Sequence, residues 1–303
     1  MKEKRVSTTK GNENLVGYTF LAPILIVFTV FTAFPVVFSF ILSFTKWDFM
    51  QGITLNSMEF AGMKNFTEIM KDPWFIESMK HTFVYTIITV PVGIALGLLL
   101  AVLINKYVFF PGLFKVTIFL PYISSAVASA VVWSVILHPS YGPVNMFLQS
   151  IGVANPPKWF ADVNYAFPAV IAFSIWQQIG YIVLVYMSGL KGIAQELYEA
   201  AEIDGCGEIK KFFVITIPMV SPTTFFLLIM QMINSFKVFD VVSALTDGGP
   251  GTSTTVIAYY IYRAAFKYYE MGKASAAAWV MFIFIFAITI YQWNQQKKFT
   301  TYS

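Results

Sequence analysis

The sequence predicts an all-α integral membrane protein that crosses the bilayer six times. Hydrophobic residues make up 57% of its 303 residues and charged residues only 12%, whereas an ordinary soluble domain carries roughly 25% charged residues. A membrane-spanning helix needs about 20 apolar residues, and six runs of that kind lack Asp, Glu, Lys and Arg. These runs also lack the two-residue alternation of barrel strands, so the spans are predicted to be helices.

The predicted boundaries follow from the apolar runs and from the turn residues between them. Pro139, Gly142 and Pro143 mark a turn that ends the third run. The transmembrane domain is predicted at 15–296, between an N-terminal tail, 1–14, and a C-terminal tail, 297–303. The six predicted spans are 15–43, 82–104, 116–137, 167–190, 217–238 and 274–294.

The first apolar run also invites comparison with a cleaved signal peptide, because basic residues precede it. Its length far exceeds the roughly 7–15 apolar residues of such a peptide, which favours an uncleaved first span. Lysine and arginine are denser in the short segments on the N-terminal side of the membrane, so both termini are predicted in the cytoplasm. The same orientation places residues 193–218, between spans four and five, in the cytoplasm.

Residues 193–218 contain a charged stretch between long apolar runs. A helix is predicted up to Gly205, which occupies the position where a left-handed residue ends a helix. Leu197 and Ala201 share one face of that helix, and Glu199 and Glu202 share another. Small residues allow another surface to approach closely, so the segment suits a docking element. A solvated connecting loop is the alternative.

The spacing within this segment resembles the EAA loop of binding-protein-dependent ABC importer permeases. Residues 17–48, 60–75 and 245–266 are also similar to the sugar permeases of this group, in the compact six-helix form of the MalF-like subunits. The chain departs from the family pattern at Ala194, Cys206 and Ile217. The matching residues are Glu199, Ala200 and Ala201, then Gly205 after three residues, and Ile215 and Pro218 after nine more, with Ile217 standing where Leu is usual.

The resemblance implies the type I ABC importer permease fold, with residues 193–218 as a cytoplasmic coupling loop. It also implies a prokaryotic inner or plasma membrane location, a second homologous permease subunit in a heterodimer, and an extracytoplasmic solute-binding protein. ATP and Mg would be bound by a separate ATPase dimer, and the cargo would be a sugar or oligosaccharide. The ATPase-coupling residues would be Glu199, Ala200, Ala201, Asp204, Gly205, Ile215 and Pro218.

No catalytic, metal or nucleic-acid site is predicted in this chain. The glycine-rich run 247–254 lacks the lysine of a phosphate-binding loop and is interpreted as a turn. His81 and His138 have no second ligand at metal-binding spacing, and no Lys/Arg run suggests nucleic acid. The single cysteine, Cys206, excludes an intramolecular disulfide.

Two polar helix faces are candidates for the substrate path, because sugars need hydrogen-bonding partners and stacking surfaces. Amides in hydrocarbon are costly without partners, so these faces are expected to turn inward. Hydrogen bonding between helices is the alternative use for such residues. The candidates are Trp176, Gln177, Gln178 and Tyr181 in span four, and Gln231, Asn234 and Ser235 in span five.

Other transporter classes remain open from the residues alone. An ion-gradient-driven carrier of a small polar solute usually has ionisable residues in mid-membrane, which the six predicted spans lack in their centres. A structural scaffold would not require a glycine-centred docking loop. Glycerol phosphate importers share this permease type, so that cargo stays open beside sugars, as does a homodimer beside a heterodimer.

Overall fold

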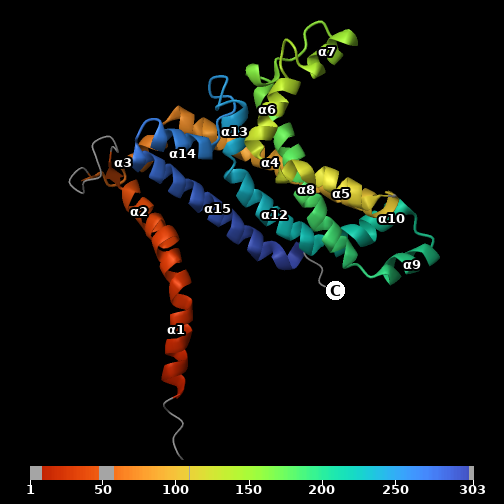
Figure 1. The fold of residues 1–303 in the computed structure, drawn as a ribbon, viewed down its shortest axis with the longest axis horizontal. Coiled ribbons are helices and arrows are strands. Elements are labelled where there is room, and N and C mark those ends of the chain that lie inside the picture. The colour runs from red at the N-terminus through yellow and green to blue at the C-terminus, as the bar shows by residue number, and fades with distance from the viewer. Residues whose placement is uncertain (1–8, 48–57, 109, 300–303) are drawn as a thin grey trace, which may run out of the picture.

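The computed structural model describes residues 9–47, 58–108 and 110–299, and within them the chain is mostly helical (Figure 1). The only strands of this described part are β1 (Thr45–Lys46) and β2 (Glu59–Phe60), which pair antiparallel. Within these residue ranges, four helices are long and apolar enough to cross a membrane, and the number reaches six if each of two bent helix pairs is one span.

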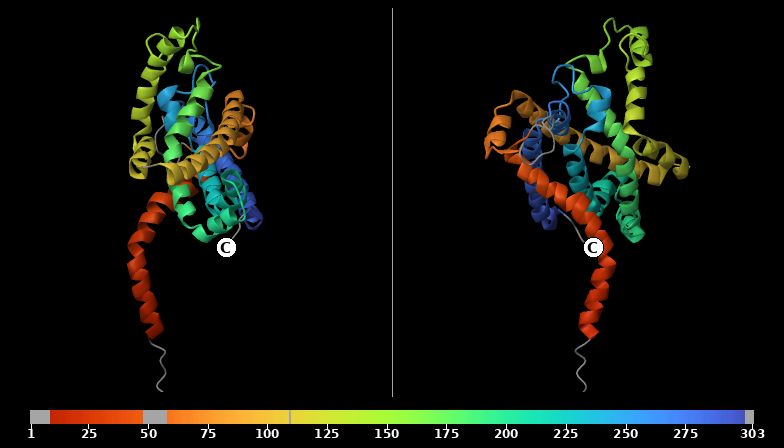
Figure 2. Two further views of the ribbon diagram at one scale, coloured as in Figure 1. Left: turned by 90° about the vertical axis from the view of Figure 1, so that its right-hand side faces the viewer. Right: turned by 60° about the vertical axis from the view of Figure 1, so that its left-hand side comes forward.

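The first membrane-spanning element is a long helix that extends away from the other helices (Figures 1 and 2). It consists of α1 (Thr9–Phe28), a π-helical turn η1 (Thr29–Ala33) and α2 (Phe34–Ser43). None of its most apolar window is buried in the isolated chain. Only its α2 end packs closely on the body, where the ring of Phe40 lies 4.9 Å from that of Trp279 on α15 (Met271–Phe299).

The second span belongs to a longer helix than predicted, α4 (Pro73–Tyr107). Its additional first turns arise because Asp72 accepts a hydrogen bond from the backbone N–H of Trp74 at 2.9 Å and caps the helix. The short α3 (Lys64–Ile69) precedes it. Along its length α4 packs on α8 (Ala166–Lys191), the fourth span.

The α4–α8 contact is close because α4 presents glycines to α8. A Cβ added at Gly97 would lie 3.0 Å from the Cβ of Ile182, and one at Gly93 would lie 3.2 Å from its Cδ1. Small residues at such positions allow two helix backbones to approach in a membrane.

The predicted third span, 116–137, is not one helix. It divides into α5 (Pro111–Ile123) and α6 (Ala126–Ile136), which meet at an angle of 99°. Pro121 cannot donate a helical hydrogen bond, and Ser124 adopts an extended backbone with ψ 146° while its hydroxyl donates to the carbonyl of Leu120.

The predicted fifth span, 217–238, is also interrupted. It contains α11 (Ile217–Met219) and α12 (Ser221–Phe236), and the helical segment that ends at Met219 makes an angle of 65° with α12. Pro218 and Pro222 lie on either side of the break, and neither has an N–H to continue a helical ladder. The segment before the break comprises α10 (Glu208–Lys211) and the π-helical η5 (Phe212–Thr216).

The end of the molecule that carries the N-terminus of α8 also carries several short elements (Figures 1 and 2). The glycine-rich run 247–254 is a set of turns there, as predicted. Thr252 in this run donates a hydrogen bond to Glu77 of α4 at 2.5 Å, and Trp74 Nε1 of α4 donates one to the adjacent Thr255 at 3.0 Å. The short elements are α7 (Pro143–Ser150), η4 (Trp159–Ala161), α13 (Asp240–Leu245) and α14 (Ile257–Phe266).

Candidate functional site

Residues 193–218, called the EAA segment from here on, lie at the C-terminal end of α8, away from α7 and α13 (Figures 1 and 2). The segment contains α9 (Gln195–Ile203), a four-residue turn, and α10, η5 and α11. It therefore has the predicted helix–turn–helix form, and it leads directly into α12.

Gly205 ends α9 through a Schellman motif. Its N–H donates to the carbonyl of Glu202 at 3.0 Å, and the N–H of Cys206 donates to the carbonyl of Ala201 at 2.8 Å. Gly205 has φ +72°, a left-handed backbone that side chains disfavour, and a Cβ added there would meet no atom within 4 Å. The glycine is thus required by the turn and not by crowding inside this chain.

The structure separates the predicted coupling residues into two groups. Glu199, Ala200 and Asp204 are exposed, and Ala201 is half-buried. Ile215 and Pro218 are half-buried instead, and Ile215 packs on the hydrophobic cluster between α4 and α8. The first group forms an accessible surface, whereas the second anchors the segment to the helices of the membrane domain.

Several large aliphatic side chains of the EAA segment are exposed. Ile203 is 88% exposed and Ile209 is 78% exposed, and Leu197 is also exposed. None of the residues of α9 is buried in the isolated chain. A short amphipathic helix with its apolar side chains exposed is typical of a surface that another protein covers.

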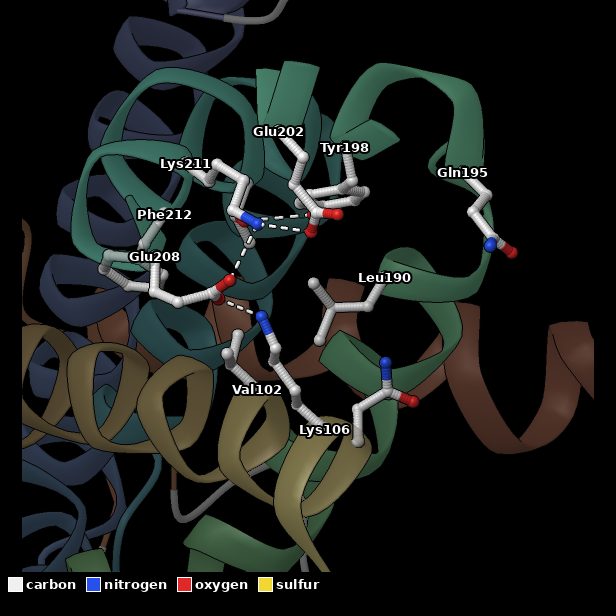
Figure 3. Close-up of a pocket in the computed structure, with 11 residues that line it drawn as sticks. Val102, Lys106, Leu190, Gln195, Tyr198, Glu202, Glu208, Lys211 and Phe212 are labelled. Carbon is white, nitrogen blue, oxygen red and sulfur yellow. Dashed lines mark hydrogen bonds and ion pairs between the residues drawn. The ribbon is translucent and has the colours of Figure 1, made fainter. Parts of the chain in front are cut away.

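A group of ion pairs connects the EAA segment to α4, and the sequence interpretation did not identify it (Figure 3). Lys211 Nζ lies 2.6 Å from a carboxylate oxygen of Glu202 and 2.7 Å from one of Glu208. Glu208 also pairs with Lys106, near the end of α4. The only sequence signal was the i, i+3 spacing of Glu208 and Lys211, since the other partners are 9 and 102 residues apart.

These charges line a cleft of about 520 Å³ between α4, α8, α9 and η5. Its walls also include Leu190 and Phe212, and Tyr198 shares a 3.0 Å hydrogen bond with Thr216 across it. The hydrogen bond from Lys211 and its positive charge lower the pKa of Glu202 below the ordinary value. Glu202 therefore stays ionised at neutral pH and remains paired.

The two predicted substrate-path faces meet each other in part. Gln231 Nε2 donates to Gln178 Oε1 at 3.0 Å, which joins α12 to α8. Ser235 shares a 2.8 Å hydrogen bond with Thr86 of α4. Gln231 and Ser235 are both buried, and in this chain they make hydrogen bonds between helices, the alternative use that the sequence left open.

The other substrate-path candidates divide between packed and accessible positions. The ring of Trp176 lies 5.3 Å from that of Trp133 on α6, and Tyr181 stacks on Tyr122 of α5 at 5.2 Å. Gln177 is half-buried, and Asn234 is exposed. Gln177 and Asn234 are thus the amides that remain accessible for a further contact.

Residues 70–300 match the family of binding-protein-dependent transport system inner membrane components. The chain belongs to this family. It is therefore a membrane permease subunit of an ABC importer and not a catalytic subunit, and it works with a binding protein and with permease partners. The resemblance of the chain to this group is confirmed.

Two permease relatives align over most of the chain. The sulfoquinovosyl glycerol transport system permease SmoG of Agrobacterium fabrum is 33% identical over 91% of this chain and 89% of its own length. The sn-glycerol-3-phosphate transport system permease UgpA of Pectobacterium atrosepticum is 31% identical over 81% of this chain and 83% of its own.

A solved permease has the same fold. A chain of a bacterial alginate ABC transporter, crystallised with an alginate pentasaccharide-bound periplasmic protein, superimposes with a TM-score of 0.84. The match covers 98% of this chain and 99% of that one at 24% sequence identity. The permease thus has the type I ABC importer fold, as predicted.

Proposed function

We propose that this permease forms half of the translocation path for a sugar or oligosaccharide that an extracytoplasmic binding protein delivers. Two of the similar proteins are named for carbohydrate cargo, a sulfoquinovosyl glycerol and an alginate. UgpA is named for sn-glycerol-3-phosphate, which keeps that polyol phosphate as the second candidate cargo. All three cargoes are hydroxyl-rich, and accessible amides such as Gln177 and Asn234 suit hydroxyl groups.

The observation that carries the transport mechanism is the exposed surface of α9. It presents Glu199, Ala200 and Asp204 beside the exposed Ile203, above a turn that Gly205 holds in place. An ATPase dimer, which binds ATP and Mg, would receive this surface in a cleft, with Glu199 facing a basic residue of that subunit. Closure of the ATPase dimer would move the EAA segment, and this chain would need no catalytic residue of its own.

The remaining parts of the proposal concern assembly and orientation. A second, homologous permease would complete the path in a heterodimer, beside the accessible Asn234. Both termini would be cytoplasmic, because the EAA segment and the two tails would then be on the side where ATP is available. The long first helix, α1 to α2, packs on the rest of the single chain mainly through its α2 end and has the length to cross the membrane.

Uptake into vesicles tests this proposal. The permease complex, reconstituted with its ATPase, should accumulate labelled sugar only when both ATP and the sugar-loaded binding protein are supplied. An imposed proton or sodium gradient should not replace ATP. Uptake that follows the ion gradient, or that proceeds without the ATPase subunits, would contradict the proposal. Stimulation of ATP hydrolysis by binding protein loaded with different solutes would then distinguish a sugar from glycerol phosphate.

A further inference from the structure

Lys211 is the only charged residue that is buried among those whose exposure the structure describes. The residue is 4% exposed, in a segment whose other charged side chains all face solvent. A buried ammonium group is costly unless it is paired and hydrogen-bonded. A neutral side chain at this position would avoid that cost, so the presence of a lysine here indicates a role for its charge.

The partners of Lys211 belong to different helices. Glu202 is in the last turn of α9, and Glu208 begins α10. Glu208 in turn pairs with Lys106 on α4, so the side chains form the continuous series Glu202–Lys211–Glu208–Lys106 (Figure 3). This series, called the ion strut from here on, connects α9 through α10 to the membrane domain.

The ion strut bridges a part of the chain that has little other support. No residue of α9 is buried, and only the four residues 204–207 join α9 to α10. The Schellman motif fixes the start of that turn but not the angle at which α10 leaves it. Besides the ion strut, Tyr198 shares a hydrogen bond with Thr216 across the two arms.

We propose that Lys211 is a positioning residue that makes the EAA segment a rigid lever. It holds α9 at a fixed angle to α10 and, through Glu208 and Lys106, ties both to α4. A displacement imposed on the exposed surface of α9 then moves α4 instead of bending the turn at 204–207. This inference rests on the proposed docking of the ATPase to α9.

Replacing Lys211 by methionine tests the charge without removing the side-chain volume. Glu202 and Glu208 are 62% and 52% exposed, so water can solvate both carboxylates once the lysine is gone. The substitution therefore leaves no buried charge unpaired, and Lys211→Met should fold and insert. Lys210→Met is the matched control, because its side chain is exposed and it makes none of the ion pairs found in the described residues. Lys211→Arg keeps the charge.

The measurement is the number of sugar molecules transported per ATP hydrolysed by the reconstituted complex with its binding protein. For Lys211→Met we expect ATP hydrolysis within about twofold of the parent and a transport ratio at least about fivefold lower, the lower end of typical coupling effects. Lys211→Arg should restore the ratio, and Lys210→Met should match the parent. Adding Glu202→Gln to Lys211→Met should lower the ratio no further, because the two residues act through one contact.

An unchanged ratio in Lys211→Met would overturn the proposal. So would an equal fall in hydrolysis and transport, because that pattern indicates a loss of folded complex and not of coupling. An equal loss in Lys210→Met would also overturn it. Failure of the underlying docking is separable, because the parent complex would then transport sugar without its ATPase subunits.

Discussion

Substitution of Gly205 tests whether another protein covers the turn of the EAA segment. At φ +72° a residue with a Cβ costs about 1–2 kcal/mol, whereas asparagine and aspartate tolerate this left-handed backbone better. Gly205→Val should therefore shift the local turn equilibrium by up to about thirtyfold, since about 1.4 kcal/mol corresponds to a factor of ten. Gly205→Asn should change it far less. No atom of this chain lies within 4 Å of the added Cβ, so no internal clash contributes.

A role in the turn alone and a role in docking predict different orders of activity for the Gly205 variants. If Gly205 served only the turn, ATP-driven uptake into vesicles would be highest for Gly205→Asn, lower for Gly205→Ala and lowest for Gly205→Val. Because we propose that the ATPase covers this turn, we expect Gly205→Asn and Gly205→Asp to abolish uptake as Val does, with normal amounts of permease in the membrane. Gly207→Ser is the control, since Gly207 has φ −70° and equally open space.

The refuting result is specific. Normal uptake by Gly205→Asn, with loss only in Gly205→Val, would mean that the turn needs its backbone conformation and that no partner packs against it. Equal loss in Gly207→Ser would show that the assay responds to any change in the turn. An immunoblot of membranes separates both results from failed insertion.

Three further predictions concern the helices and the ion strut. Gln231→Ala should destabilise the permease by about 0.5–1.5 kcal/mol, because it removes the hydrogen bond from the buried Gln231 to the half-buried Gln178; a melting temperature equal to the parent's would contradict this, and the double variant Gln231→Leu, Gln178→Leu should recover part of the loss. Gly180→Ala should lower the melting temperature, since the added Cβ would lie 2.8 Å from the Cα of Phe119 on α5, whereas Gly112→Ala meets nothing within 4 Å and should not. The pKa of Glu202 is lowered in the folded state, so its pairing is present above the unfolded pKa and is lost as pH falls through the folded one. Transport per ATP should therefore be constant between about pH 6 and 8, and a steep change in that range that Glu202→Gln removes would contradict the assignment.

The membrane class and the EAA turn could be predicted from the sequence because both are local. Apolar runs without charge set the number of candidate spans, and Gly205 has the backbone that its position after α9 predicts. The breaks in the third and fifth spans were missed, since a hydropathy count treats Pro121, Ser124 and Pro222 as parts of one apolar run. Their effect on the backbone depends on what packs beside them.

The substrate-path prediction was limited in a different way. The i, i+4 spacing of Gln231 and Ser235 predicted a shared inward face, and both side chains are buried. Spacing along one helix cannot say whether that face meets cargo or another helix. The partners Gln178 and Thr86 are 53 and 149 residues away in sequence, so the pairing became visible only in three dimensions. The ion strut was missed for the same reason.

The position of the fifth-span break explains why the ion strut connects to α4. The chain bends by 65° around Val220, between the EAA segment and α12. A displacement of α9 that was transmitted only along the backbone would reach this bend first and would be absorbed there, since Pro218 and Pro222 leave the helical hydrogen bonding incomplete.

The pair Glu208–Lys106 bypasses the bend and transmits the displacement to α4, which is continuous over 35 residues. Because the glycines of α4 pack closely on Ile182, α8 has to follow. Motion of the EAA segment should thus rotate α4 and α8 together, and α12 should be displaced through its side-chain bonds to those two helices instead of through its own backbone.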